Sequence, residues 1–124
     1  MERPDLTRIV AALSRAAHSP TGDTAQVIEL LACLTPDGCL DEAARIPAEY
    51  WRIKWWQHGR VAWTGHLFYG GRGWLLRRDG AEDEPFLKLE ATRLRPGEHL
   101  MLHQPDGQVL GFRVVNVGSP AASC

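Results

Sequence analysis

The stretch from Pro47 to Tyr69, PAEYWRIKWWQHGRVAWTGHLFY, decides the fold because its apolar residues follow the spacing of β-strands. Trp51, Ile53 and Trp55 recur at every second position and are expected to point into the core, because successive side chains of a strand point to opposite faces of a sheet. A second strand is predicted from Arg60 to about Tyr69. The two strands form an antiparallel hairpin around a short turn that contains a glycine.

Two turns can join these strands, and they place the side chains differently. A two-residue loop at His58-Gly59 would mix charged and apolar residues on both faces of the hairpin. A three-residue loop, Gln57-His58-Gly59, separates the faces and is favoured here, with Gly59 in the left-handed third position. The favoured loop pairs Trp55 with Val61, Ile53 with Trp63, Arg52 with Thr64, and Trp56 with Arg60.

The same pattern continues towards the C-terminus and predicts about six antiparallel strands in all. The loop Pro105-Asp106-Gly107 is expected to pair Leu102 with Leu110 and Leu100 with Phe112. Open sheet edges promote aggregation, so these strands should close into a small barrel or a strongly curved sheet. The four later strands are predicted near Trp74–Arg78, Phe86–Leu94, Glu98–Gln104 and Gln108–Val117.

Upstream of Pro47 the apolar spacing fits helices. Residues 5–18 and 23–34 each present apolar side chains at a period of about 3.6, and a short third helix is predicted over 41–45. These helices would cap one opening of the sheet or cover its apolar face. The sequence therefore predicts an α+β fold, with two or three N-terminal helices followed by the antiparallel strands.

Length and composition place the chain among small globular proteins. Its 124 residues predict a single domain, 1–124, with a helical segment (1–47), an antiparallel β segment (48–117) and a flexible tail (118–124). Arginine outnumbers lysine twelve to two, as in GC-rich bacterial genomes, and the net charge of −1 offers no global attraction to nucleic acid. No signal peptide or membrane span is predicted, so the cytoplasm is the expected location.

One face of the first hairpin stands out as a candidate binding surface. Between Tyr50 and Arg78 there are six basic residues and no acidic one, interleaved with aromatic residues. Arginine and lysine can pair with phosphates while bases stack on aromatic rings, so single-stranded RNA or DNA is the first ligand to consider. The candidate contact residues are Arg52, Lys54, Trp56, Arg60, His66, Phe68 and Arg72.

Three alternatives remain open for this face and for the function. The N-terminal helices could cover Trp56 and Phe68, or the same residues could bind a protein partner or a second copy of the chain. A small-ligand or catalytic barrel would need a pocket at the barrel mouth, near His66 or His99.

Catalysis is not indicated by the sequence. No nucleophile and base form a recognisable set, and His99 and His103 lie too far apart on one strand to chelate a metal directly. We therefore expect a non-enzymatic binding module, or a subunit of a larger assembly, without metal or cofactor.

Overall fold

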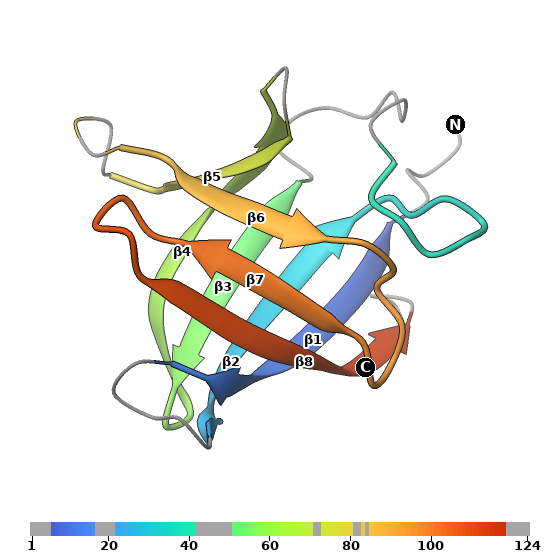
Figure 1. Ribbon diagram of the computed structural model, residues 1–124, viewed down its shortest axis with the longest axis horizontal. Helices are drawn as coiled ribbons and strands as arrows, with labels where there is room; N and C mark the ends of the chain where they lie inside the picture. Colours follow the sequence, from blue (N-terminus) through green and yellow to red (C-terminus); the bar gives the residue numbers. More distant parts are fainter. Residues whose placement is uncertain are drawn as a thin grey trace.

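The computed structural model describes residues 6–16, 22–41, 51–70, 73–80, 83 and 85–118, and these form one closed, eight-stranded antiparallel β-barrel (Figure 1). Each strand pairs with the next, and β1 pairs with β8 to close the barrel. The strands are β1 (Thr7–Arg15), β2 (Asp23–Ala32), β3 (Arg52–Gln57), β4 (Arg60–Tyr69), β5 (Trp74–Arg78), β6 (Leu87–Ala91), β7 (His99–His103) and β8 (Val109–Gly118).

The predicted α+β class is wrong, because the described residues contain no helix and the fold is all-β. The two long helices expected over 5–18 and 23–34 are replaced by β1 and β2. The expected third helix lies almost wholly outside the described residues, as does the tail beyond Gly118. The described ranges offer no helical segment that could serve as a membrane span.

The burial pattern explains why these strands were mistaken for helices. In β1 the buried side chains are those of Ile9, Ala11 and Leu13, which recur at every second residue. Their outward neighbours Val10 and Ala12 are also apolar, so the apolar residues fit either period. Strand pairing settles the choice, because β1 pairs with both β2 and β8. Without β1, each of these two strands would have an edge with unpaired backbone groups.

The six C-terminal strands are confirmed, and the register of the last hairpin is correct. Leu100 pairs with Phe112 and Leu102 pairs with Leu110. Gly107 has a φ of 92°, as the three-residue turn between these strands requires. A short polar turn with glycine at its left-handed position was enough to specify this hairpin.

The register of the first hairpin is wrong in the sequence-based prediction. The turn has two residues, His58 and Gly59, both with positive φ (52° and 80°), and Gln57 pairs with Arg60. A β-bulge then adds one residue in β4, so that Trp55 pairs with Trp63. The bulge restores the separation of apolar and polar faces that a two-residue turn alone would lose. The resulting outward pairs are Trp56 with Val61, Lys54 with Thr64, and Arg52 with His66.

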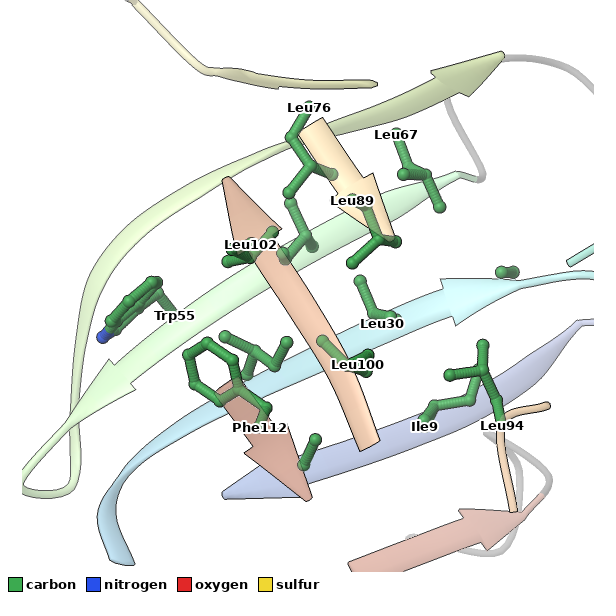
Figure 2. Packing of buried hydrophobic residues seen from close by; sticks show 14 of the residues in the cluster. Ile9, Leu30, Trp55, Leu67, Leu76, Leu89, Leu94, Leu100, Leu102 and Phe112 are labelled. Atoms are coloured by element: carbon green, nitrogen blue, oxygen red, sulfur yellow. The ribbon is translucent and has the colours of Figure 1, made fainter. Parts of the chain in front are cut away.

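Apolar side chains fill the barrel interior. Figure 2 shows leucines from five strands meeting Phe112 and Ile9 in this core. Eight strands enclose a space just wide enough for side chains to fill. Trp51, Ile53 and Trp55 point inward as predicted, and Trp63 packs against the core while only partly buried.

Candidate functional site

The predicted basic-aromatic face is only partly assembled. Arg52, Lys54 and Trp56 share the outward face of β3, and His66 and Phe68 share that of β4. Arg60 does not face Trp56 as expected. It pairs with Gln57 and so lies on the other side of the hairpin. Arg72 and Tyr50 fall outside the described residues.

A carboxylate that follows the basic stretch neutralises much of this face. Asp79 lies in the turn after β5, and its Oδ2 accepts hydrogen bonds from Arg52 Nη2 at 2.9 Å and Thr64 Oγ1 at 2.6 Å. Its Oδ1 lies 3.0 Å from His66 Nδ1. The stretch without acidic residues, Tyr50 to Arg78, ends one residue before Asp79. In the folded protein Asp79 nevertheless lies on this surface, because β5 brings it next to side chains of β3 and β4.

The hydrogen bonds around His66 define its protonation state. His66 Nε2 lies 3.0 Å from Arg52 Nη1, and a guanidinium can only donate, so Nε2 accepts. Nδ1 then carries the proton and donates it to Asp79. Arg52 occupies Nε2 and the Thr64 hydroxyl donates to Asp79, so the described contacts give the imidazole no hydroxyl or thiol to activate.

The cluster shifts the ionisation of its carboxylate. The pKa of Asp79 lies below its ordinary value of 3.8, mainly because Thr64 donates a hydrogen bond to the charged form. Partial desolvation opposes the shift, while the hydrogen bond and charge of Arg52 add to it. Asp79 is therefore a stable counter-ion for Arg52 at neutral pH.

A second carboxylate enters the face from β2. Glu29 lies beside Lys54 in the register and forms an ion pair with Arg8 of β1. Lys54 itself is exposed, and no described carboxylate lies within ion-pair distance of it. Two carboxylates thus interrupt the basic surface that the hairpin sequence alone suggests.

The aromatic members of the face are also engaged. Phe68 meets the ring of Phe86 edge-on, with centroids 5.1 Å apart, and the guanidinium of Arg77 lies 4.6 Å from the centre of the Phe86 ring. Trp56 is half-buried and lies beside Val27 and Val61 in the register. These rings are less available for base stacking than the sequence suggested.

A pocket of about 400 Å³ lies at one end of the barrel, where sequence reasoning placed no site. The β3–β4, β5–β6 and β7–β8 connections all meet at this end, because consecutive strands run in opposite directions. Neither His66 nor His99, the residues suggested for a mouth pocket, lines this pocket. The lining residues are Trp55, Gln57, Trp63, Arg78, Pro85, Leu87, Gln104, Pro105 and Asp106.

The pocket wall contains a buried hydrogen-bond donor without an acceptor. Trp55 is only 5% exposed, and no described atom accepts a hydrogen bond from its Nε1. Its ring packs edge-on against Phe112, with centroids 5.4 Å apart, and lies 5.6 Å from the ring of Trp63. In Figure 2 the nitrogen lies on the side of the ring that faces away from the core residues. A buried N–H without a partner costs roughly 1–3 kcal/mol, which a bound acceptor would recover.

The other polar groups of the pocket balance one another in charge. Arg78 and Asp106 contribute one cation and one carboxylate, and Gln57 and Gln104 add amides that can donate and accept. The guanidinium of Arg78 lies 5.6 Å from the centre of the Trp63 ring. This mixture of flat apolar walls and a few polar groups is typical of small-molecule sites.

The described residues hold no cluster of three His, Cys, Asp or Glu side chains suited to a metal ion. The polar pair on the far outer wall, His103 and Glu90, joins Nε2 and Oε2 at 2.7 Å and has no third ligand of this kind. Protein-family models, curated proteins and solved structures give no match to this chain.

Proposed function

We propose that this protein is a non-enzymatic binding module that holds a small organic ligand in the pocket at the end of the barrel. The observation that carries the proposal is that Trp55 lines the pocket and that its buried Nε1 has no acceptor among the described residues. Nearly all buried polar groups in proteins are hydrogen-bonded, and exceptions are often explained by a bound partner.

The chemistry of the lining supports one class of ligand. An acceptor atom is needed opposite Trp55, and the apolar surfaces of Trp63, Pro85 and Leu87 fit a flat hydrocarbon body. One cation and one carboxylate line the pocket, so an uncharged ligand leaves the charge balance of the pocket unchanged. We therefore expect a planar, uncharged molecule that carries a carbonyl or a similar acceptor.

Coumarin is a suitable first probe, because it is planar, uncharged and bears a lactone carbonyl. The indole N–H resonance of Trp55 can be followed by NMR while coumarin is added to the full-length protein. We expect this resonance to move with saturation, whereas naphthalene, which has a similar body and no acceptor, should bind more weakly. A protein that binds neither probe would overturn the proposal.

A matched pair of variants tests the role of the indole nitrogen. Trp55→Phe keeps an aromatic ring and removes the N–H, and the loss of one hydrogen bond should weaken coumarin binding about two- to tenfold. Trp56→Phe makes the same change on the opposite side of the barrel wall and should leave the affinity unchanged. Equal effects of the two substitutions would place the probe outside the pocket.

Single-stranded nucleic acid remains a prediction for the outer face of the first hairpin. The outward positions of Arg52, Lys54 and Trp56 support it. The hydrogen bonds of Asp79 to Arg52 and the contact between Phe68 and Phe86 weigh against it, since they occupy groups that would bind phosphates and bases. The pocket is therefore the better-supported site.

A further inference from the structure

Four apolar side chains form a continuous row on the outside of the barrel. The register pairs Ala12 with Val27, Val27 with Trp56, and Trp56 with Val61, so the row crosses β1, β2, β3 and β4. We call Ala12, Val27, Trp56 and Val61 the outer apolar row. Neighbouring strands lie about 4.8 Å apart, so the row runs roughly 14 Å from β1 to β4.

These residues occupy positions that are usually polar. A sheet with one buried face normally turns polar side chains to water on the other. Here Val61 is 44% exposed, and Ala12, Val27 and Trp56 are half-buried. Val10 lies in the next outward position of β1 and is half-buried as well. Contiguous exposed apolar surface of this kind marks interaction sites.

The charges around the outer apolar row have one predominant sign. Whereas the whole chain has a net charge of −1, cations outnumber carboxylates on this part of the outer wall. Lys54 and Arg113 are exposed, lie next to the row and have no described ion-pair partner. Arg8 pairs with Glu29 and Arg52 pairs with Asp79, so Lys54 and Arg113 are the excess cations beside the row.

This combination distinguishes between possible partners. A second copy of the chain would bring its own excess of cations against this face, which opposes symmetric self-association. Nucleic acid would match the charge, but Ala12, Val27 and Val61 offer no flat surface on which bases can stack. A protein segment with apolar and acidic side chains matches both the row and its charges.

We propose that the outer apolar row and its flanking cations dock a protein segment in which acidic side chains alternate with apolar ones. The apolar side chains lie against Val27, Trp56 and Val61, and the carboxylates pair with Lys54 and Arg113. This surface is separate from the pocket, since none of its residues lines that site. The docking surface and the ligand pocket can therefore be tested independently.

Fluorescence anisotropy with a labelled synthetic peptide tests this proposal on the full-length protein. The probe alternates glutamate and leucine over about twelve residues, which span roughly 40 Å when extended. We expect it to bind, and binding to weaken as salt is raised because charge attraction contributes. A peptide with lysine in place of glutamate should not bind. Failure of the acidic peptide to bind, or tighter binding of an oligothymidylate, would overturn the proposal.

The two lysines of the chain provide a matched pair of variants. Lys54→Glu reverses a charge beside the row and should weaken peptide binding at least about threefold. Lys88→Glu makes the same change on β6, on another part of the outer wall, and should leave the affinity unchanged. Equal effects would show that the peptide responds only to net charge. Self-association of the free protein that Trp56→Ala abolishes would also overturn the proposal, in favour of a second copy.

Discussion

Trp55 and Trp56 are adjacent in the chain, yet the barrel wall separates their side chains: Trp55 packs against Phe112 in the core, and Trp56 lies outside beside Val27 and Val61. One residue therefore supports the pocket and the other the outer apolar row. Because successive side chains of β3 point to opposite faces, this one strand contributes to both proposed sites, although no residue belongs to both.

This relationship predicts unequal effects on stability. Trp55→Ala removes a large core side chain and should lower the free energy of unfolding by about 3–5 kcal/mol. Trp56→Ala loses only cross-strand contacts on a half-exposed face and should cost roughly 1 kcal/mol. Denaturant titration of both variants measures the difference. Equal losses would mean that both faces of β3 are packed, which would remove Trp56 from any docking surface.

Gly65 occupies a strand position where a side chain would collide with the backbone. A Cβ built there would meet the carbonyl oxygen of Arg77 on β5. We expect Gly65→Ala to destabilise the protein by about 1–3 kcal/mol, because β5 must move away from β4. Gly111→Ala is the control, since its Cβ would meet Arg15 Cβ at an ordinary 3.5 Å. If the two substitutions lower the free energy of unfolding by the same amount, the close approach of β4 and β5 has no energetic consequence.

The turn of the first hairpin predicts a stabilising substitution. His58 and Gly59 both have positive φ, as a two-residue turn of type I′ requires, and asparagine adopts this conformation more readily than histidine. His58→Asn should raise the free energy of unfolding by about 0.5 kcal/mol, and Gly59→Ala should lower it by about 1 kcal/mol. A neutral effect of His58→Asn would mean that histidine at the positive-φ position has no energetic cost.

The sequence specified the C-terminal strands because each has a clear apolar alternation and a polar turn on either side. It failed for β1 and β2 because Val10 and Ala12 make the outward face of β1 nearly as apolar as the inward face. That outward apolarity, which suggested a helix, is also what forms part of the outer apolar row. The element that was hardest to assign is thus one that carries a proposed function.

The candidate sites show the same limit of local reasoning. The outward positions of Arg52, Lys54 and Trp56 followed from alternation within one hairpin. The ion pair of Arg52 with Asp79, and the place of Glu29 beside Lys54, depend on the pairing of β5 and β2 with that hairpin. The pocket draws its residues from β3, β4, β5 and β6 and from the β5–β6 and β7–β8 connections, and no short stretch of sequence contains its pattern. A buried, inward-pointing Trp55 was predicted, but the absence of an acceptor for its nitrogen required the assembled barrel.

The cluster around Asp79 predicts a pH-dependent difference in stability. Since the pKa of Asp79 is lowered in the folded state, its stabilising effect is present above the unfolded value near 3.8 and is lost as pH falls through the folded pKa. Asp79→Asn should cost about 0.5–1 kcal/mol at pH 7, because the cluster is more than a third exposed and screened by water. Thermal unfolding from pH 7 to pH 2 should show the variant and the parent converging below pH 4. Asp37→Asn, at an exposed turn residue, is the control, and a constant difference at all pH values would show that Asp79 acts without its charge.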